Sequence, residues 1–179
     1  LNAGIAAVVL GRESLAAWPV VWGLVMLIGG PAWSLQQLAN ALAVDHAAYR
    51  QVRRFALGLS SLFALLLAGV ALSPAYGLVM GGVYNLSAAL QSLARPATLM
   101  MIPYPLLLGL QGLLRGVLIR RGSTTAVRSA VLANLLTLTA AILSGMWLIR
   151  PTGVVLAAVA MQTALLAEVG WLAFQERRT

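Results

Sequence analysis

Long apolar stretches separated by short polar turns run through almost the whole chain. From Ser14 onwards most of these stretches are long enough for a helix that crosses a bilayer, which needs about 20 residues, whereas the apolar residues 1–10 are too few. We therefore expect an all-α fold, a polytopic transmembrane helix bundle that forms a single domain over residues 1–179. Residues 1–10 would be the outer part of a helix whose beginning is missing, and the chain would be half of a longer protein. The predicted complete spans are residues 14–44, 46–72, 96–119, 126–149 and 153–174.

Proline and glycine mark two irregular regions. Gly29-Gly30-Pro31 falls inside the first complete span and predicts a kink, because proline lacks the backbone N–H and clashes with the preceding turn. The stretch Ser73–Arg95 is too broken to span, so we expect a loop followed by a short interfacial helix over residues 86–94. Side chains suited to capping a helix N-terminus stand at Ser14, Asp45 and Thr152.

The arginines alternate between dense and sparse connections. Clusters follow the first, third and fifth complete spans: Arg50, Arg53, Arg54, then Arg120, Arg121, Arg128, then Arg177, Arg178. The connections between them carry single arginines: Arg12, Arg95 and Arg150. Because positive charge is retained on the cytoplasmic side of a membrane, this bias predicts a multi-pass protein of the cell inner membrane with a cytoplasmic C-terminus. The partial first helix would bring the spans to six, with both ends of the unit cytoplasmic.

Composition limits the functions open to the chain. It is 61% hydrophobic and only 9% charged, against about a quarter charged in soluble domains. The net charge of +8 does not indicate nucleic acid, because the arginines lie at span boundaries; the lipid bilayer is the expected partner. The chain has no cysteine, one histidine (His46) and four carboxylates, with no nucleophile triad and no phosphate-binding loop. We therefore expect no metal site, no cofactor and no enzymatic activity.

Three passages carry a family resemblance when they are taken in order. Leu10–Ala17 (LGRESLAA) is similar to a turn between two helices, and Leu113–Thr124 (LLRGVLIRRGST) is similar to the end of a fourth helix. Asn134–Leu136 and Pro151–Ala160 are similar to a fifth helix and the start of a sixth. Together they resemble one six-helix half of the superfamily that contains multidrug and toxic compound extrusion (MATE) transporters, polysaccharide and oligosaccharide-lipid flippases, and progressive ankylosis (ANK) proteins. The basic ending of Val117–Arg121 and the late Glu168 are more similar to the ANK-type members.

The resemblance implies a transporter or flippase in which two such halves enclose a central cavity and move an organic ion or amphipathic solute by alternating access. The other half would belong to the same protein or to a second copy of this chain. One departure matters, because drug extruders of antiporter type carry cation-coupling carboxylates in mid-helix, and the second to fifth family helices have none here. Coupling to sodium or protons is therefore unsupported by these residues.

Four polar residues are candidates for contact with a solute. Gln36 and Asn40 are four residues apart and share one helix face, and Gln111 and Arg115 share another. Lipid offers such faces no partner, so they must point to other helices or to a cavity. Arg115 lies five residues, roughly 7 Å along a helix, inside Arg120. It either contacts an anion at the cytoplasmic mouth of a cavity, or it is an arginine that snorkels to the interface or is paired and fixes helix packing; we favour the second.

Glu168 lies eight residues before Glu176 and is the candidate for an ion pair or a coupling site. Arg115 and Arg128 come from helices that end on the same side, so either could pair with Glu168 by depth. We favour a structural pair over a proton or cation site. Two further polar residues are isolated, and hydrogen bonds between helices are expected for them: Asn134 and Gln162.

Two classes of function are compatible with these patterns. The first is half of an alternating-access transporter or flippase. The alternative is a non-catalytic structural or accessory subunit of a larger membrane complex, and a pore is the weakest hypothesis because no ring of charge is visible. The four candidate solute contacts discriminate between the first two: a shared water-filled cavity favours transport, whereas pairing of all four within the bundle favours a structural role.

Overall fold

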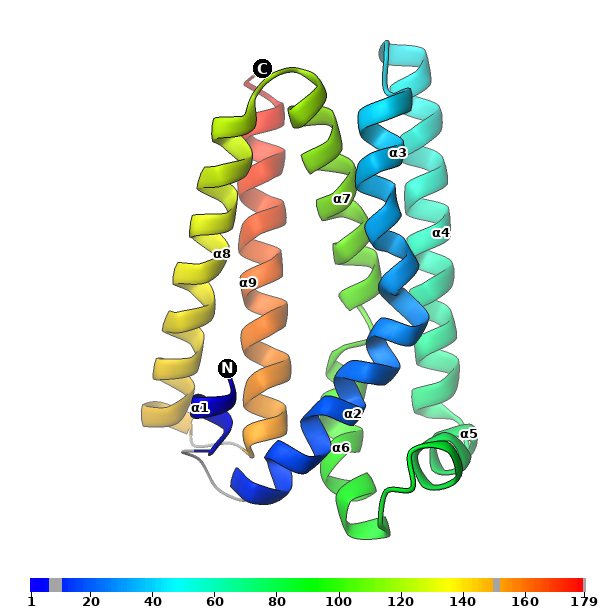
Figure 1. Cartoon of the computed structure of the whole chain (residues 1–179), viewed down its shortest axis with the longest axis vertical. Helices are drawn as coiled ribbons and strands as arrows, with labels where there is room; N and C mark the ends of the chain where they lie inside the picture. The colour runs from blue at the N-terminus through cyan, green and yellow to red at the C-terminus, as the bar shows by residue number, and fades with distance from the viewer. Residues whose placement is uncertain (7–10, 150–151, 179) are drawn as a thin grey trace.

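The computed structural model describes residues 1–6, 11–149 and 152–178, and it is a bundle of α-helices with no strand in these ranges (Figure 1). The expectation of an all-α helical bundle is confirmed. Residues 7–10 of the expected partial helix, and Arg150, lie outside the described residues. The helices are α1 (Asn2–Ala6), α2 (Gly11–Gly29), α3 (Ser34–Leu42), α4 (His46–Leu72), α5 (Ala75–Gly77), α6 (Ala88–Met100), α7 (Tyr104–Arg120), α8 (Thr124–Ser144) and α9 (Gly153–Glu176), with a 3₁₀ turn η1 (Gly30–Trp33) and π-helical turns η2 (Leu78–Val83) and η3 (Gly145–Ile149).

Several of these helices are long and apolar enough to cross a membrane. Four continuous stretches qualify within the described ranges, and α6 with α7 makes a fifth if the bent pair counts as one span. The four are Gly11–Leu42, His46–Leu72, Thr124–Trp147 and Gly153–Glu176. Of these, α9 is the most buried and α8 the least, so α8 lies on the outside of the bundle. The arrangement fits a protein that spans a membrane.

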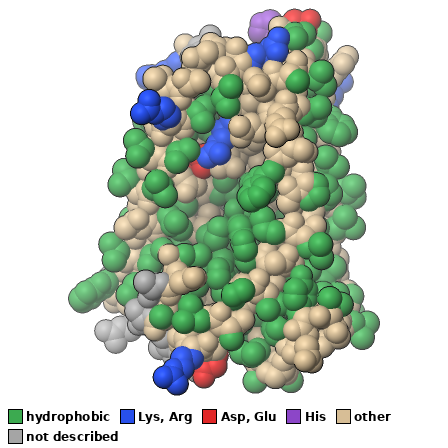
Figure 2. Space-filling model, in the orientation of Figure 1, with side chains coloured by type: hydrophobic (Ala, Val, Ile, Leu, Met, Phe, Trp, Pro, Cys, Tyr) green, Lys and Arg blue, Asp and Glu red, His purple; other side chains and the backbone are tan. Residues whose placement is uncertain are grey.

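The arginine clusters fall at one end of the bundle. The α3–α4 turn, the α7–α8 turn and the C-terminus lie together at the upper end in Figure 1, whereas α5 and the start of α9 lie at the lower end. Figure 2 shows that most of the basic side chains visible on this face lie towards the upper end, above a largely hydrophobic and hollowed middle. We call this end, with Arg50, Arg53, Arg54, Arg120, Arg121, Arg128, Arg177 and Arg178, the Arg-rich end.

Glycines on α7 allow α3 and α4 to pack closely against it. A Cβ built on Gly116 would overlap the carbonyl oxygen of Gln36 and would lie 2.7 Å from the Cβ of Ala39. A Cβ on Gly112 would lie 3.2 Å from the backbone nitrogen of Gln36, and one on Gly109 would overlap the hydroxyl of Ser60 on α4. Small residues three and four apart therefore form the face on which two neighbouring helices rest.

The first complete span begins earlier than expected, and Ser14 is not its cap. Helix α2 starts at Gly11, and Ser14 lies inside it, fully buried, with a hydroxyl that has no partner among the described residues. A Cβ on Gly153 would lie 2.9 Å from the Cβ of Ser14, so this small side chain fills the contact between α2 and the start of α9. Packing, rather than capping, explains the serine. The irregularity expected at Gly29-Gly30-Pro31 is present as the 3₁₀ turn η1.

The expected boundary between an interfacial helix over 86–94 and a span starting at residue 96 is wrong. Helix α6 runs from Ala88 to Met100 through Pro96, and Ser87 is its N-cap. The break comes after Met100, and α6 and α7 meet at an angle of 42°. One proline removes a single donor, which a helix tolerates, whereas Pro103 and Pro105 remove two donors within three residues and end it. The loop before α6 is itself helical over α5 and η2.

The cap predicted at Asp45 is confirmed and gives a first testable prediction. Its carboxylate accepts a 2.8 Å hydrogen bond from the backbone N–H of Ala48, in the first turn of α4. We expect Asp45→Ala to lower the free energy of unfolding by about 1 kcal/mol, measured by thermal denaturation in detergent. Asp45→Asn keeps an acceptor oxygen and is expected to retain most of the stability. An equal loss in both variants would show that the hydrogen bond to Ala48 is not the cause.

Candidate functional site

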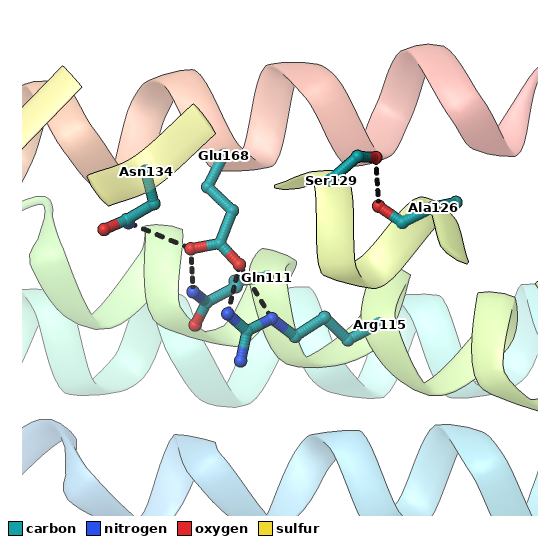
Figure 3. A network of polar contacts seen from close by, with 6 residues as sticks. All are labelled: Gln111, Arg115, Ala126, Ser129, Asn134 and Glu168. Carbon is teal, nitrogen blue, oxygen red and sulfur yellow. Dashed lines mark hydrogen bonds and ion pairs between the residues drawn. The ribbon is translucent and has the colours of Figure 1, made fainter. Parts of the chain in front are cut away.

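A buried carboxylate joins three helices in the half of the bundle nearer the Arg-rich end. Glu168 on α9 is only 1% exposed, and polar side chains of α7 and α8 surround it (Figure 3). One of its oxygens, Oε1, accepts from Nε of Arg115 at 2.7 Å and also from Nη2 of Arg115. The other, Oε2, accepts from the amides of Gln111 at 2.7 Å and Asn134 at 2.9 Å. We call these four residues the Glu168 cluster.

Helix geometry explains how the Glu168 cluster assembles. Gln111 and Arg115 are four residues apart on α7, so their side chains lie on one face, one turn above the other. Gly112 and Gly116, which contact α3, directly follow Gln111 and Arg115, so they lie on an adjacent face of α7, while the two polar side chains reach Glu168 of α9. Asn134 reaches the same carboxylate from α8, which packs along α9.

The hydrogen bonding of Glu168 is complete. Each carboxylate oxygen has two acceptor positions, and the four donated hydrogen bonds occupy all four. Burial of an ionised group without a partner is costly, and pairing with Arg115 together with two amide donors offsets that cost. The cluster therefore holds α7, α8 and α9 in one arrangement.

Arg115 is the least enclosed member of the Glu168 cluster. Its side chain is 24% exposed, against 1% for Glu168. Its Nε and Nη2 bind Glu168, whereas its Nη1 donates to no side chain or carbonyl in the described part of the chain. A guanidinium has five N–H groups, so part of this one is still available to water or to an anion.

The structure separates the other predicted solute contacts from this cluster. Gln36 is half-buried and Asn40 is exposed on α3, and both contact α7 through their backbone atoms. The carbonyl oxygen of Asn40 accepts from Arg120 at 2.8 Å. The structure thus brings Gln111 and Arg115 together at Glu168, whereas Gln36 and Asn40 lie apart from them.

The pairing of Glu168 with Arg128, which depth alone allowed, is wrong. Arg128 is exposed on α8 and is not among the described donors to Glu168. It lies six residues, about 9 Å along a helix, closer to the Arg-rich end than Asn134, which is the α8 residue at the level of the carboxylate. Ser129, next to Arg128, accepts instead from the indole of Trp171 at 2.9 Å.

The two isolated polar residues both form the hydrogen bonds between helices that were expected. Asn134 joins the Glu168 cluster, and Gln162 donates from α9 to the carbonyl oxygen of Met100 at 3.0 Å. That carbonyl belongs to the last residue of α6, where the break before α7 leaves it without a helical partner. The sequence did not predict that Asn134 binds Glu168. The rotation of α8 about its axis decides which helix its side chain contacts.

The site offers anion binding and ion pairing as its chemistry. No group of three His, Asp or Glu side chains that could hold a metal occurs in the described ranges. Comparison with known proteins adds nothing further, since no protein family, curated protein or solved structure matches the chain.

Proposed function

We propose that this chain is one half of an alternating-access membrane transporter or flippase of the MATE/ANK-like class, acting on an organic anion or an acidic amphipathic solute. It would lie in the cell inner membrane with the Arg-rich end and the C-terminus in the cytoplasm. The observation that carries the proposal is the ion pair of Arg115 and Glu168 within the spans, with Arg115 partly exposed. Ionisable residues at membrane depth are rare, and they mark solute or ion pathways in pumps and transporters.

The chemistry of Arg115 supports an anionic solute. Inserting an arginine at the centre of a span costs about 2.5–3.5 kcal/mol of free energy. Glu168 neutralises this charge while no solute is bound. A carboxylate or phosphate of a solute would compete with Glu168 for the same donors, because guanidinium binds both with the same fork geometry. The solute would then replace one partner of an existing pair rather than create a new charge in lipid.

Interrupted helices also support a transporter. Helices α6 and α7 meet at 42°, η1 interrupts the first long helix, and η3 ends α8. Transporters commonly form their solute and ion sites from interrupted helices of this kind.

One specific observation favours the alternative, a structural subunit. Glu168 already has four donors, and Gln36 and Asn40 do not converge on it. A cluster whose hydrogen bonds are complete without a solute is what a purely structural role in helix packing requires. The two proposals differ in whether the cluster becomes reachable from both sides of the membrane.

Cysteine labelling tests this difference, and residues 1–179 contain no cysteine that would also react. Gln111 lies nine residues, about 14 Å along a helix, inside Arg120, so a reagent reaches it only through a water-filled path. We expect Gln111→Cys in the full-length protein to react with a membrane-impermeant thiosulfonate from either side, in right-side-out and in inverted vesicles. The end markers His46→Cys and Glu13→Cys are expected to react from one side each, and from opposite sides.

The controls make the result decisive. Labelling of Gln111→Cys from one side only, or from neither, would favour the structural subunit. Reaction of His46→Cys from the outer side would overturn the proposed orientation and leave alternating access untouched, because the two readouts are separate.

A further inference from the structure

We propose that the Arg-rich end holds a binding pocket for a phosphate group, either that of an anionic phospholipid or that of a soluble phosphate compound. The pocket lies between the α3–α4 turn and the last turn of α7, away from the Glu168 cluster. Its lining includes Val44, His46, Tyr49, Arg120 and Arg121. The proposal does not depend on transport, since it rests on the geometry of this end alone.

The cavity has the size of a small-ligand site. It measures about 360 Å³, within the range of roughly 300–1,000 Å³ that is usual for such sites. It lies at the ends of α3, α4 and α7, which are spans or parts of spans, and therefore at the depth where the headgroups of a bilayer lie. A phospholipid headgroup could enter it from the membrane, and a soluble ion could enter it from water.

Arg120 is held at this pocket by the end of α3. Its Nη1 donates to the carbonyl oxygens of Asn40 at 2.8 Å and Ala41 at 3.2 Å, which are among the last carbonyls of that helix. These bonds fix the guanidinium on the pocket wall. Its Nε and Nη2 donate to no group in the described part of the chain, so they remain available to an anion.

The charges around the pocket favour an anion. Arg121 also lines it, and α4, which starts at the pocket with His46, has its positive helix end there. Two acids counter this charge: Asp45, which also lines the pocket and caps α4, and Glu176, which lies 3.8 Å from a guanidinium nitrogen of Arg121. Arginine is the residue that binds phosphate with paired N–H groups, and basic pockets between spans bind lipid phosphates.

The experiment measures the thermal midpoint of the purified full-length protein in a neutral detergent. Phosphatidylglycerol, phosphatidylcholine and inorganic phosphate are titrated separately. We expect phosphatidylglycerol or phosphate to raise the midpoint saturably, and phosphatidylcholine to have little effect because its choline cancels the charge. Arg120→Gln is expected to weaken the apparent affinity about tenfold or more, the loss typical of one charged hydrogen bond. Arg177→Gln removes the same charge from the same end, outside the pocket, and is expected to change affinity by about twofold or less.

The comparison of ligands identifies the source of the phosphate. A shift with phosphatidylglycerol alone assigns the pocket to a lipid headgroup, and an equal shift with inorganic phosphate assigns it to a soluble compound. Because Arg120 also caps α3, the variant could fold poorly; His46→Glu then tests the pocket, with the exposed Thr125→Glu as its control. No shift with any ligand overturns the proposal, and so does an equal loss in the pocket variant and its control.

Discussion

Replacing Arg115 by methionine is expected to lower the free energy of unfolding by about 3–5 kcal/mol, the largest effect of any single substitution that we predict. Glu168 is 1% exposed and would lose its only charged partner among the described residues, with two amide donors remaining. The variant must either bury an unpaired charge or protonate the carboxylate, and both lower stability. Thermal unfolding in detergent, followed by circular dichroism, measures the change.

Two further variants separate the ion pair from the loss of a long side chain. Arg115→Met combined with Glu168→Met removes both charges, so we expect it to recover most of the lost stability. Arg128→Met removes an exposed arginine from the neighbouring helix and is expected to shift stability by about 0.5 kcal/mol or less. If the single Arg115 variant were as stable as the natural chain, the ion pair would not hold α7 to α9.

Replacing Gly116 by alanine is expected to destabilise the bundle by about 1–3 kcal/mol. The new Cβ would overlap the carbonyl oxygen of Gln36 and would lie 2.7 Å from the Cβ of Ala39. Backbone cannot give way as a flexible side chain can, so α3 must move away from α7. The same thermal denaturation measures the loss.

Gly170→Ala on α9 is the matched control. A Cβ there meets nothing within 4 Å, so the substitution keeps the same chemistry without the clash. Alanine forms helix better than glycine by about 1 kcal/mol, and this variant is expected to be as stable as the natural chain or slightly more stable. Equal behaviour of the two variants would contradict the close contact between α3 and α7.

Much of the fold followed from the sequence because lipid imposes simple rules. Apolar stretches of span length predicted the long helices, and the cap at Asp45 followed from side-chain chemistry. The boundary near Pro96 did not, since proline is compatible with both a helix start and a helix interior in a membrane protein. The number of backbone donors lost locally decides between these, and the loss at Pro103 and Pro105 places the break between Met100 and Tyr104.

The Glu168 cluster was predictable only in part. The spacing of Gln111 and Arg115 placed both on one face, and depth placed Glu168 at a similar level. Depth could not separate Arg115 from Arg128, because both lie near the same end of the bundle. The partner of Glu168 depends on how each helix is rotated about its own axis. The glycines of α7 pack against α3, and in this rotation of α7 the side chain of Arg115 reaches α9.

Helix α9 bridges the break between α6 and α7. Gln162 binds the carbonyl oxygen of Met100 on one side of the break, and Glu168 binds Gln111 and Arg115 on the other. These two anchor points are six residues, about 9 Å, apart on the continuous helix α9, which therefore contacts the chain on both sides of the break. A change in the 42° bend would move the partners of these two anchor points relative to each other. We therefore expect the angle between α6 and α7 to depend on the ion pair, so that loss of the Glu168 contacts would leave Gln162 as the only one of these two anchor points.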